Sequence, residues 1–134
     1  MTIHIPNYIT RAYITEANRA QGLLFLYGDT VGHDGNGGQA SQARGCEGAH
    51  VIPVKWRKCY NDEDAFFSDY KYDLQVALIM RALCELPEGK PIVVFPKIGL
   101  GMNKMDVKAP RTYRALISIL RGLPDVINKD SLPC

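Results

Sequence analysis

The 134-residue sequence contains no apolar run near the roughly 18 residues that a membrane-spanning helix needs. Residues 1–5 have none of the features of a signal peptide. We also find no internal repeat and no low-complexity tract. A hydrophobic content of 46% against 22% charged residues is typical of a globular domain. We therefore expect a single domain over residues 1–134, in the cytoplasm, with no membrane partner.

Paired cysteine motifs are also missing. The four cysteines have no CxxC spacing, and without a secretory signal we expect them to stay reduced. Cys46, His50 and Cys59 are conceivable zinc ligands, but their spacing is irregular and a fourth ligand is missing. We expect no metal and no cofactor. Cys84 falls among helical apolar residues and is predicted to lie in the core.

Neither sign of charge predominates, because the net charge is only +2. Residues 97–134 carry seven basic and three acidic side chains, and this stretch accounts for the surplus. A nucleic-acid-binding domain of this size is usually more basic, so nucleic acid is an unlikely partner. A local basic patch beside a small polyphosphate fits equally well. The oligomeric state is left open.

Apolar runs alternate with helical patterns along the chain. The runs that predict buried strands are 23–27, 50–54 and 92–95, and the helical patterns cover 10–19, 39–44, 69–86 and 110–121. Pro53 favours an edge or a strand end. A short strand over 3–5 is also possible, and 61–64 and the tail after Gly122 are expected to be loose. This alternation predicts an α/β fold, a three-layer α/β/α domain with a mostly parallel central sheet.

One helical pattern makes a specific prediction about the core. In 69–86, with Ser68 or Asp69 as the N-cap, the apolar residues recur at steps of three and four. The predicted buried stripe consists of Val76, Ile79, Met80, Leu83 and Leu86.

Two glycine-rich loops follow the predicted strands. The first contains Gly35, Gly37 and Gly38, and the second contains Gly99 and Gly101. Ligands of α/β sheets bind beyond the carboxyl ends of the strands, and glycine lets backbone N–H groups approach an anion. The two loops together suggest a diphosphate site, although each could be only a tight turn. The Walker lysine pattern is absent, and no acidic residue ends the next strand as a NAD site requires.

Three segments carry a resemblance to a known family. They read Gly28-Asp29-Thr30, then Gly35-Asn36-Gly37-Gly38-Gln39-Ala40, then Pro96-Lys97-Ile98-Gly99-Leu100-Gly101-Met102. Over about residues 23–121 the chain resembles the macro domain superfamily. It is most similar to compact members such as the terminal ADP-ribose glycohydrolases and related phage macro-like proteins. The resemblance implies a macro-domain-like fold with a core over about 23–121.

The same resemblance implies that the chain binds ADP-ribose or a related nucleotide, either to sequester it or to remove it from a target. A phage protein could use this activity to counter signalling by its host. The ligand-binding residues it implies are Asp29, Thr30, Gly35, Asn36, Gly37, Gly38 and Gln39 in the first loop, with Gly99, Leu100, Gly101 and Met102 in the second. The first loop would surround the distal ribose, and the second would hold the diphosphate through backbone N–H groups. From its position alone, Asp29 either binds a ribose or simply ends a strand.

The chain departs from the family at its N-terminus and at one catalytic position. No Gly-Asp-Ile stretch for adenine recognition precedes residue 23. Lys55 falls where the glycohydrolases have a lysine, but Asn103 occupies the position of their aspartate, and Asp106 is the nearest carboxylate or else a helix N-cap. A desolvated Lys55 would attack the anomeric carbon and form a Schiff base. Alternatively, it is a surface lysine or an electrostatic contact to the ligand.

Binding is therefore better supported than hydrolysis through Lys55. A third hypothesis for the function is a nucleic-acid-binding module that uses the basic stretch 97–121. Aromatic residues also cluster around an acidic segment, where they either stack on adenine or pack as a surface flap. They are Trp56, Phe66, Phe67, Tyr70 and Tyr72.

Overall fold

The computed structural model describes residues 8–35, 38–59 and 61–133. Its main elements are α1 (Arg11–Gln21), β1 (Leu24–Thr30), α2 (Gly38–Ala43), β2 (Ala49–Lys55), α3 (Tyr72–Cys84), β3 (Ile92–Val94), α4 (Met105–Lys108) and α5 (Pro110–Arg121). Short 3-10 turns at Glu63–Ala65, Asp69–Lys71, Gly101–Asn103 and Lys129–Ser131 join them. The expected strand over 3–5 lies outside the described residues.

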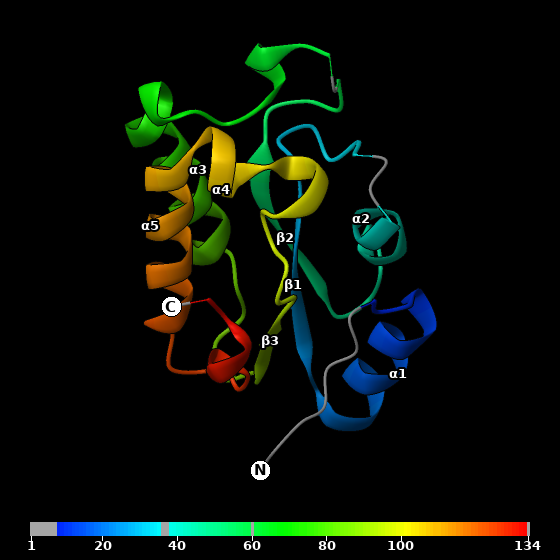
Figure 1. The fold of residues 1–134 in the computed structure, drawn as a ribbon. Coiled ribbons are helices and arrows are strands. Elements are labelled where there is room, and N and C mark those ends of the chain that lie inside the picture. Colours follow the sequence, from blue (N-terminus) through cyan, green and yellow to red (C-terminus); the bar gives the residue numbers. More distant parts are fainter. Residues whose placement is uncertain (1–7, 36–37, 60, 134) are drawn as a thin grey trace.

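The sheet is small and parallel, with strand order β2-β1-β3. The central strand β1 pairs with β2 from Phe25 opposite Ala49, and with β3 from Leu24 opposite Ile92. Helices α1 and α2 lie on one side of the sheet, and α3 and α5 lie on the other (Figure 1). The predicted α/β class with a parallel sheet between helices is confirmed.

Strand β1 contributes to two hydrophobic cores because successive side chains point to opposite faces. Leu24 and Leu26 pack with α3 and α5. Phe25 and Tyr27 pack with α1 and α2. Burial of both faces explains why this strand is a continuous apolar run rather than an alternating pattern.

Local signals set several boundaries correctly. The Thr10 hydroxyl accepts a hydrogen bond from the Tyr13 N–H at 3.2 Å and caps α1, as expected. Helix α5 covers Pro110–Arg121, as its pattern predicts, with proline at the first helical position. Pro53 lies in the edge strand β2, where a missing N–H does no harm to the sheet.

The prediction for α3 is wrong at both ends and in part of its stripe. The helix begins at Tyr72 after a 3-10 turn and ends at Cys84. Met80 is 43% exposed and Cys84 is also exposed, whereas the polar Gln75 is buried. The Gln75 amide accepts from the Ser68 N–H and donates to the Ser68 carbonyl and the Thr112 hydroxyl. These bonds satisfy a polar group that periodicity alone places outside the core.

The segments expected to be loose are ordered. Glu63–Ala65 forms a 3-10 turn. Beyond α5, Val126 makes a parallel bridge with Ile92 of β3. The Asn128 amide then accepts from the Val94 N–H at 2.9 Å and donates to the Val94 carbonyl at 2.7 Å. A side chain here replaces the backbone of a fourth strand along the β3 edge.

Candidate functional site

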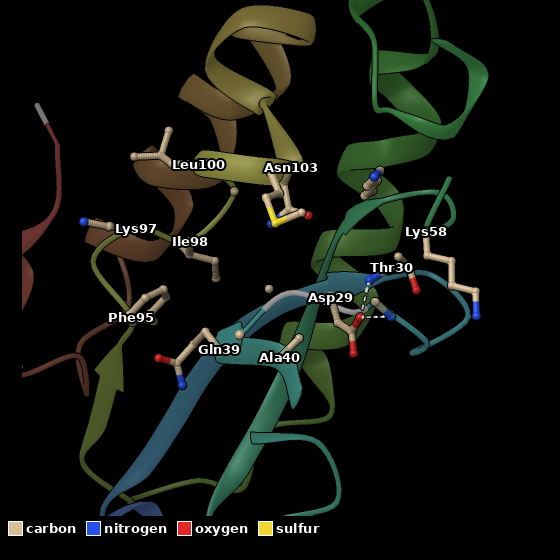
Figure 2. Close-up of a pocket in the computed structure, with 17 residues that line it drawn as sticks. Asp29, Thr30, Gln39, Ala40, Lys58, Phe95, Lys97, Ile98, Leu100 and Asn103 are labelled. Carbon is tan, nitrogen blue, oxygen red and sulfur yellow. Dashed lines mark hydrogen bonds between the residues drawn. The ribbon is translucent and has the colours of Figure 1, made fainter. Parts of the chain in front are cut away.

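A cavity of about 200 Å³ opens where the carboxyl ends of β1, β2 and β3 meet the two glycine loops (Figure 2). Its lining residues from the first half of the chain are Gly28, Asp29, Thr30, Gly35, Gly38, Gln39, Ala40, Lys55 and Lys58. Those from the second half are Phe95, Lys97, Ile98, Gly99, Leu100, Gly101, Met102 and Asn103. Strands β1 and β2 thus contribute residues to one cavity, and Phe95, which directly follows β3, completes that edge of the sheet.

Most residues singled out in the sequence meet in this cavity. Asn36 and Gly37 of the first loop lie outside the described residues. Asp106 does not line the cavity. It lies exposed in the first turn of α4, whose N-cap position is Lys104, so the N-cap alternative for Asp106 is also wrong.

Asp29 holds the first loop together. Its side chain is fully buried, and Oδ1 accepts hydrogen bonds from the N–H groups of Thr30 at 2.7 Å and Gly35 at 2.9 Å. Oδ2 accepts from the Arg44 guanidinium, through Nε at 3.1 Å and Nη2 at 2.9 Å. Four donors occupy the roughly four lone-pair sites of a carboxylate. Asp29 therefore has no capacity left for a ribose hydroxyl.

Thr30 and Gln39 have similar bracing roles. The Thr30 hydroxyl donates to the Asp34 carboxylate at 2.6 Å and accepts from the Asp34 N–H at 3.0 Å. The Gln39 amide accepts from the Ile9 N–H at 3.0 Å and donates to the Ile9 carbonyl at 2.9 Å. In Figure 2 the Gln39 amide points away from Asn103. Both side chains shape the loop and its attachment to the N-terminal segment.

Backbone donors remain on both sides of the cavity. Within the described part of the chain, the N–H groups of Gly99 and Gly101 find no acceptor, and neither do those of Gly38 and Gln39. Gly99 and Gly101 have φ values of +79° and +64°, which other residues adopt only with strain. Successive N–H groups in such a loop form a concavity suited to an anion.

Lys55 ends β2 inside the cavity. It is only 2% exposed, and its Nζ lies 4.4 Å from the centroid of the Phe66 ring. Burial lowers the pKa of the Lys55 amine; Cys59 opposes this effect and the positive charge of Lys104 adds to it. The alternative of a plain surface lysine is therefore wrong.

Two further lysines converge on Phe66. The ammonium of Lys104 lies 5.6 Å from the ring centroid, and that of Lys108 lies 5.5 Å from it. Lys108 also donates to both carboxylate oxygens of Glu63, at 2.8 and 2.7 Å. Lys104 is in the left-handed backbone region with φ of +52°, which is uncommon for a residue other than glycine or asparagine.

Asn103 shares the cavity with Lys55. Its side chain makes no hydrogen bond within the described residues, and in Figure 2 it projects between the two loops. An amide does not serve as a general base. The only carboxylate that lines the cavity in the described chain is Asp29, which is saturated.

The aromatic cluster does not line the cavity. Phe66 and Phe67 are buried, and Trp56 packs edge-on against Phe67 with ring centroids 5.0 Å apart. Tyr70 is 94% exposed, and Tyr72 lies 3.8 Å from the Arg111 guanidinium. Among the described residues, Phe95 at the end of β3 is the aromatic side chain that lines the cavity.

The predicted site residues lacked seven residues of this region, and three of them, Gly28, Ala40 and Ile98, stand inside the quoted motifs. Lys58, Phe95 and Lys97 also line the cavity, and Arg44 holds Asp29. Lys97 could also have been predicted, because it lies inside the third quoted motif, Pro96–Met102. A buried aspartate at a strand end also needs a cation, and Arg44 is close in the sequence.

The conceivable zinc ligands are separated by the sheet. Cys46 packs with the α1 and α2 core, and its Sγ lies 3.0 Å from the Thr15 hydroxyl. The His50 ring is bonded to the Ala82 carbonyl of α3, on the opposite face. No group of three potential ligands among His, Cys, Asp and Glu exists in the described ranges. None of the helices in the described chain is long and apolar enough to span a bilayer.

The fold and the cavity define a small α/β protein with a cleft at the carboxyl edge of a parallel sheet. The chain belongs to a family of unknown function, DUF7831, whose family model matches residues 7–119. The comparison with curated proteins gave no match, and neither did the comparison with solved structures.

Proposed function

We propose that the cavity binds ADP-ribose or a related nucleoside diphosphate derivative, either to sequester the nucleotide or to take it from a target. The proposal adopts the ligand that the macro-domain resemblance implies. One observation carries it: two glycine loops, far apart in the sequence, present unbonded backbone N–H groups to the same cavity within the described chain. Such donors suit a diphosphate, because they bind it without ordering any side chain.

The cavity size sets how much of the ligand is enclosed. Pockets that bury a drug-sized ligand measure about 300–1,000 Å³. A volume of about 200 Å³ holds a sugar and phosphate portion and leaves the nucleoside near the rim. Phe95 is the lining side chain on which a base would stack.

Calorimetric titration with ADP-ribose tests the proposal, with ADP, AMP and NAD as comparators. The decisive variant is Gly101→Glu, which puts a bulky anion into the second loop. Gly89→Glu is a matched control, since both glycines have positive φ and open space around the Cβ position, but Gly89 does not line the cavity. We expect saturable binding to be lost in Gly101→Glu and kept in Gly89→Glu. Equal affinity in both variants would remove the site.

A second candidate function is hydrolysis of an ADP-ribosyl bond through Lys55. Its burial in the cavity and lowered pKa favour a nucleophilic amine. The amine would bond to the anomeric carbon as the bond to the leaving group breaks, and its proton would pass to that group. Ring opening then gives a Schiff base, which water cleaves to ADP-ribose and free amine.

This candidate lacks a carboxyl group to move the proton, because Asp29 is saturated and Asp106 lies outside the cavity. Borohydride reduction during turnover should trap a covalent adduct on Lys55, detected by mass spectrometry, and Lys55→Ala should abolish it. Absence of both adduct and turnover removes hydrolysis while leaving binding in place.

A further inference from the structure

Helix α3 turns an apolar face towards solvent. Its inner side packs against β2 and α5, and there Gln75 and Ile79 are buried. On its outer side Leu74 is 53% exposed and Met80 is 43% exposed, and Ala77 between them is also exposed. A surface helix normally carries polar residues on its outer face, whereas a helix that is apolar on all sides is typically buried. No element of the described chain covers this side of α3, so its apolar atoms are in contact with water.

Ala77 lies at the centre of this outer face. Asp73 and Arg81 lie four residues before and after it, so the three side chains project from the same side of the helix, about 6 Å apart along its axis. Leu74 and Met80 lie three residues before and after Ala77, one on each flank. Asp73 and Arg81 are exposed and form no ion pair within the described ranges. A small residue at the centre lets a second helix approach closely.

The chemistry of the face is symmetric about Ala77, with the charge reversed from one end to the other. Leu74 matches Met80 in character, and the acidic Asp73 matches the basic Arg81. A two-fold axis through Ala77 runs a second α3 antiparallel to the first and brings each position opposite its counterpart. Asp73 of either copy then lies opposite Arg81 of the other. A parallel arrangement would instead place like charges opposite each other.

We infer that this outer face of α3 docks on the same face of a second copy of the chain, antiparallel and about a two-fold axis at Ala77. The apolar side chains of Leu74 and Met80 leave water together, and the ion pairs between Asp73 and Arg81 of the two copies fix the register. None of these residues lines the cavity, so the inference is independent of the proposed function.

The size of the face sets the strength of the association. Tyr70, which is 94% exposed in the 3-10 turn before α3, extends the face at one end. A single helix face with one such ring still buries less than the roughly 1,600 Å² of a standard interface. We therefore expect a reversible dimer with a Kd in the micromolar range, weakened by salt because both ion pairs lie near the surface.

Sedimentation equilibrium of the full chain, at about 5 to 500 μM, measures this association. Arg81→Asp puts acidic residues opposite each other in both pairs and should raise the Kd at least tenfold. Asp73→Arg should do the same with basic residues. The double variant Asp73→Arg/Arg81→Asp restores opposite charges across the axis, so its Kd should return to within threefold of that of the parent protein.

Two further variants make the test specific. Ala77→Glu keeps both ion-pair partners but places like charges at the axis itself, and it should raise the Kd at least tenfold. Arg19→Asp is the matched control, because Arg19 is also an exposed arginine in the last turn of a helix, on α1 across the sheet. It should change the Kd less than threefold. Circular dichroism of each variant verifies that the fold is kept.

Three results would overturn the inference. A chain that stays monomeric over the whole concentration range leaves the face to a different protein. A dimer that neither Arg81→Asp nor Ala77→Glu weakens uses another surface. A dimer that is lost in both single charge reversals and is not regained in the folded double variant does not have the antiparallel register.

Discussion

Arg44 and Asp29 form an ion pair in which Nε and Nη2 of the guanidinium both donate to the same carboxylate oxygen, Oδ2, at 3.1 and 2.9 Å. The other oxygen is bonded to the backbone of Thr30 and Gly35. Arg44 also donates to the Gly35 carbonyl at 2.6 Å. This pair ties the end of α2, the end of β1 and the first glycine loop to one another.

Loss of Arg44 should destabilise the fold. Arg44→Leu leaves the fully buried Asp29 carboxylate without its cation. Removing one partner of a buried pair costs about 3–5 kcal/mol, and the one-third exposure of Arg44 lowers the expected loss to about 2 kcal/mol. Urea unfolding measures it. Arg19→Leu breaks the exposed pair with Glu47 and should cost less than about 0.5 kcal/mol, so equal losses in the two variants contradict the role of Arg44.

Gly32 and Gly35, which both lie between β1 and α2, should differ in their tolerance of a methyl group. A Cβ at Gly35 would lie 2.6 Å from Asp29 Oδ1, whereas at Gly32 the nearest atom, Asp34 Cγ, is 3.9 Å away. Gly35→Ala should therefore destabilise the protein by about 1–3 kcal/mol, and Gly32→Ala should stay within about 0.5 kcal/mol. Thermal unfolding of both variants gives the comparison. A neutral Gly35→Ala would mean that Asp29 can move away from the loop.

The stability contributed by Lys55 should depend on pH. Its pKa is lowered in the folded state, mainly by burial, so the folded protein binds fewer protons than the unfolded chain between that lowered pKa and about 10.4. Stability from this residue therefore rises with pH in that window. Lys55→Met removes this dependence, so its stability advantage over the parent protein should be largest at neutral pH and shrink towards about pH 10.

Urea midpoints of parent and variant across that range provide the measurement. Lys97→Met, which removes an exposed lysine of the same cavity, separates burial from simple loss of charge. An advantage of Lys55→Met that grows with pH would reverse the expected sign.

Asn128 should matter far more than its place near the C-terminus suggests. Asn128→Leu leaves the N–H and carbonyl of Val94 buried without partners, at a cost of about 1–3 kcal/mol for each unsatisfied group. Denaturant unfolding should show a loss of at least about 2 kcal/mol. Asp130→Ala, at an exposed position two residues on, should be nearly neutral.

The sequence predicted those features that local chemistry determines. The apolar runs of β1 and β3, the Thr10 cap and the span of α5 follow from burial, capping and periodicity. Two glycine loops after parallel strands also sufficed to gather most cavity residues, because parallel strands end at the same edge of a sheet.

Long-range partners account for the errors. Gln75 is buried because Thr112, 37 residues away, satisfies its amide. Asn128 orders the C-terminal segment through Val94, 34 residues away. Asp29 and Gln39 looked available to a ligand until Arg44 and Ile9 were placed beside them. No pattern within a short window carries this information.

The bond between Asn128 and Val94 also affects how the protein meets other copies of itself. An open sheet edge presents backbone donors and acceptors on which a further strand can add. On the β3 side, Val126 and the Asn128 amide already occupy that edge. On the β2 side, Pro53 offers no N–H, and Phe66 makes an antiparallel bridge with Lys55 at the strand end. Within the described ranges, the three-stranded sheet is thus protected against edge-to-edge aggregation at both margins.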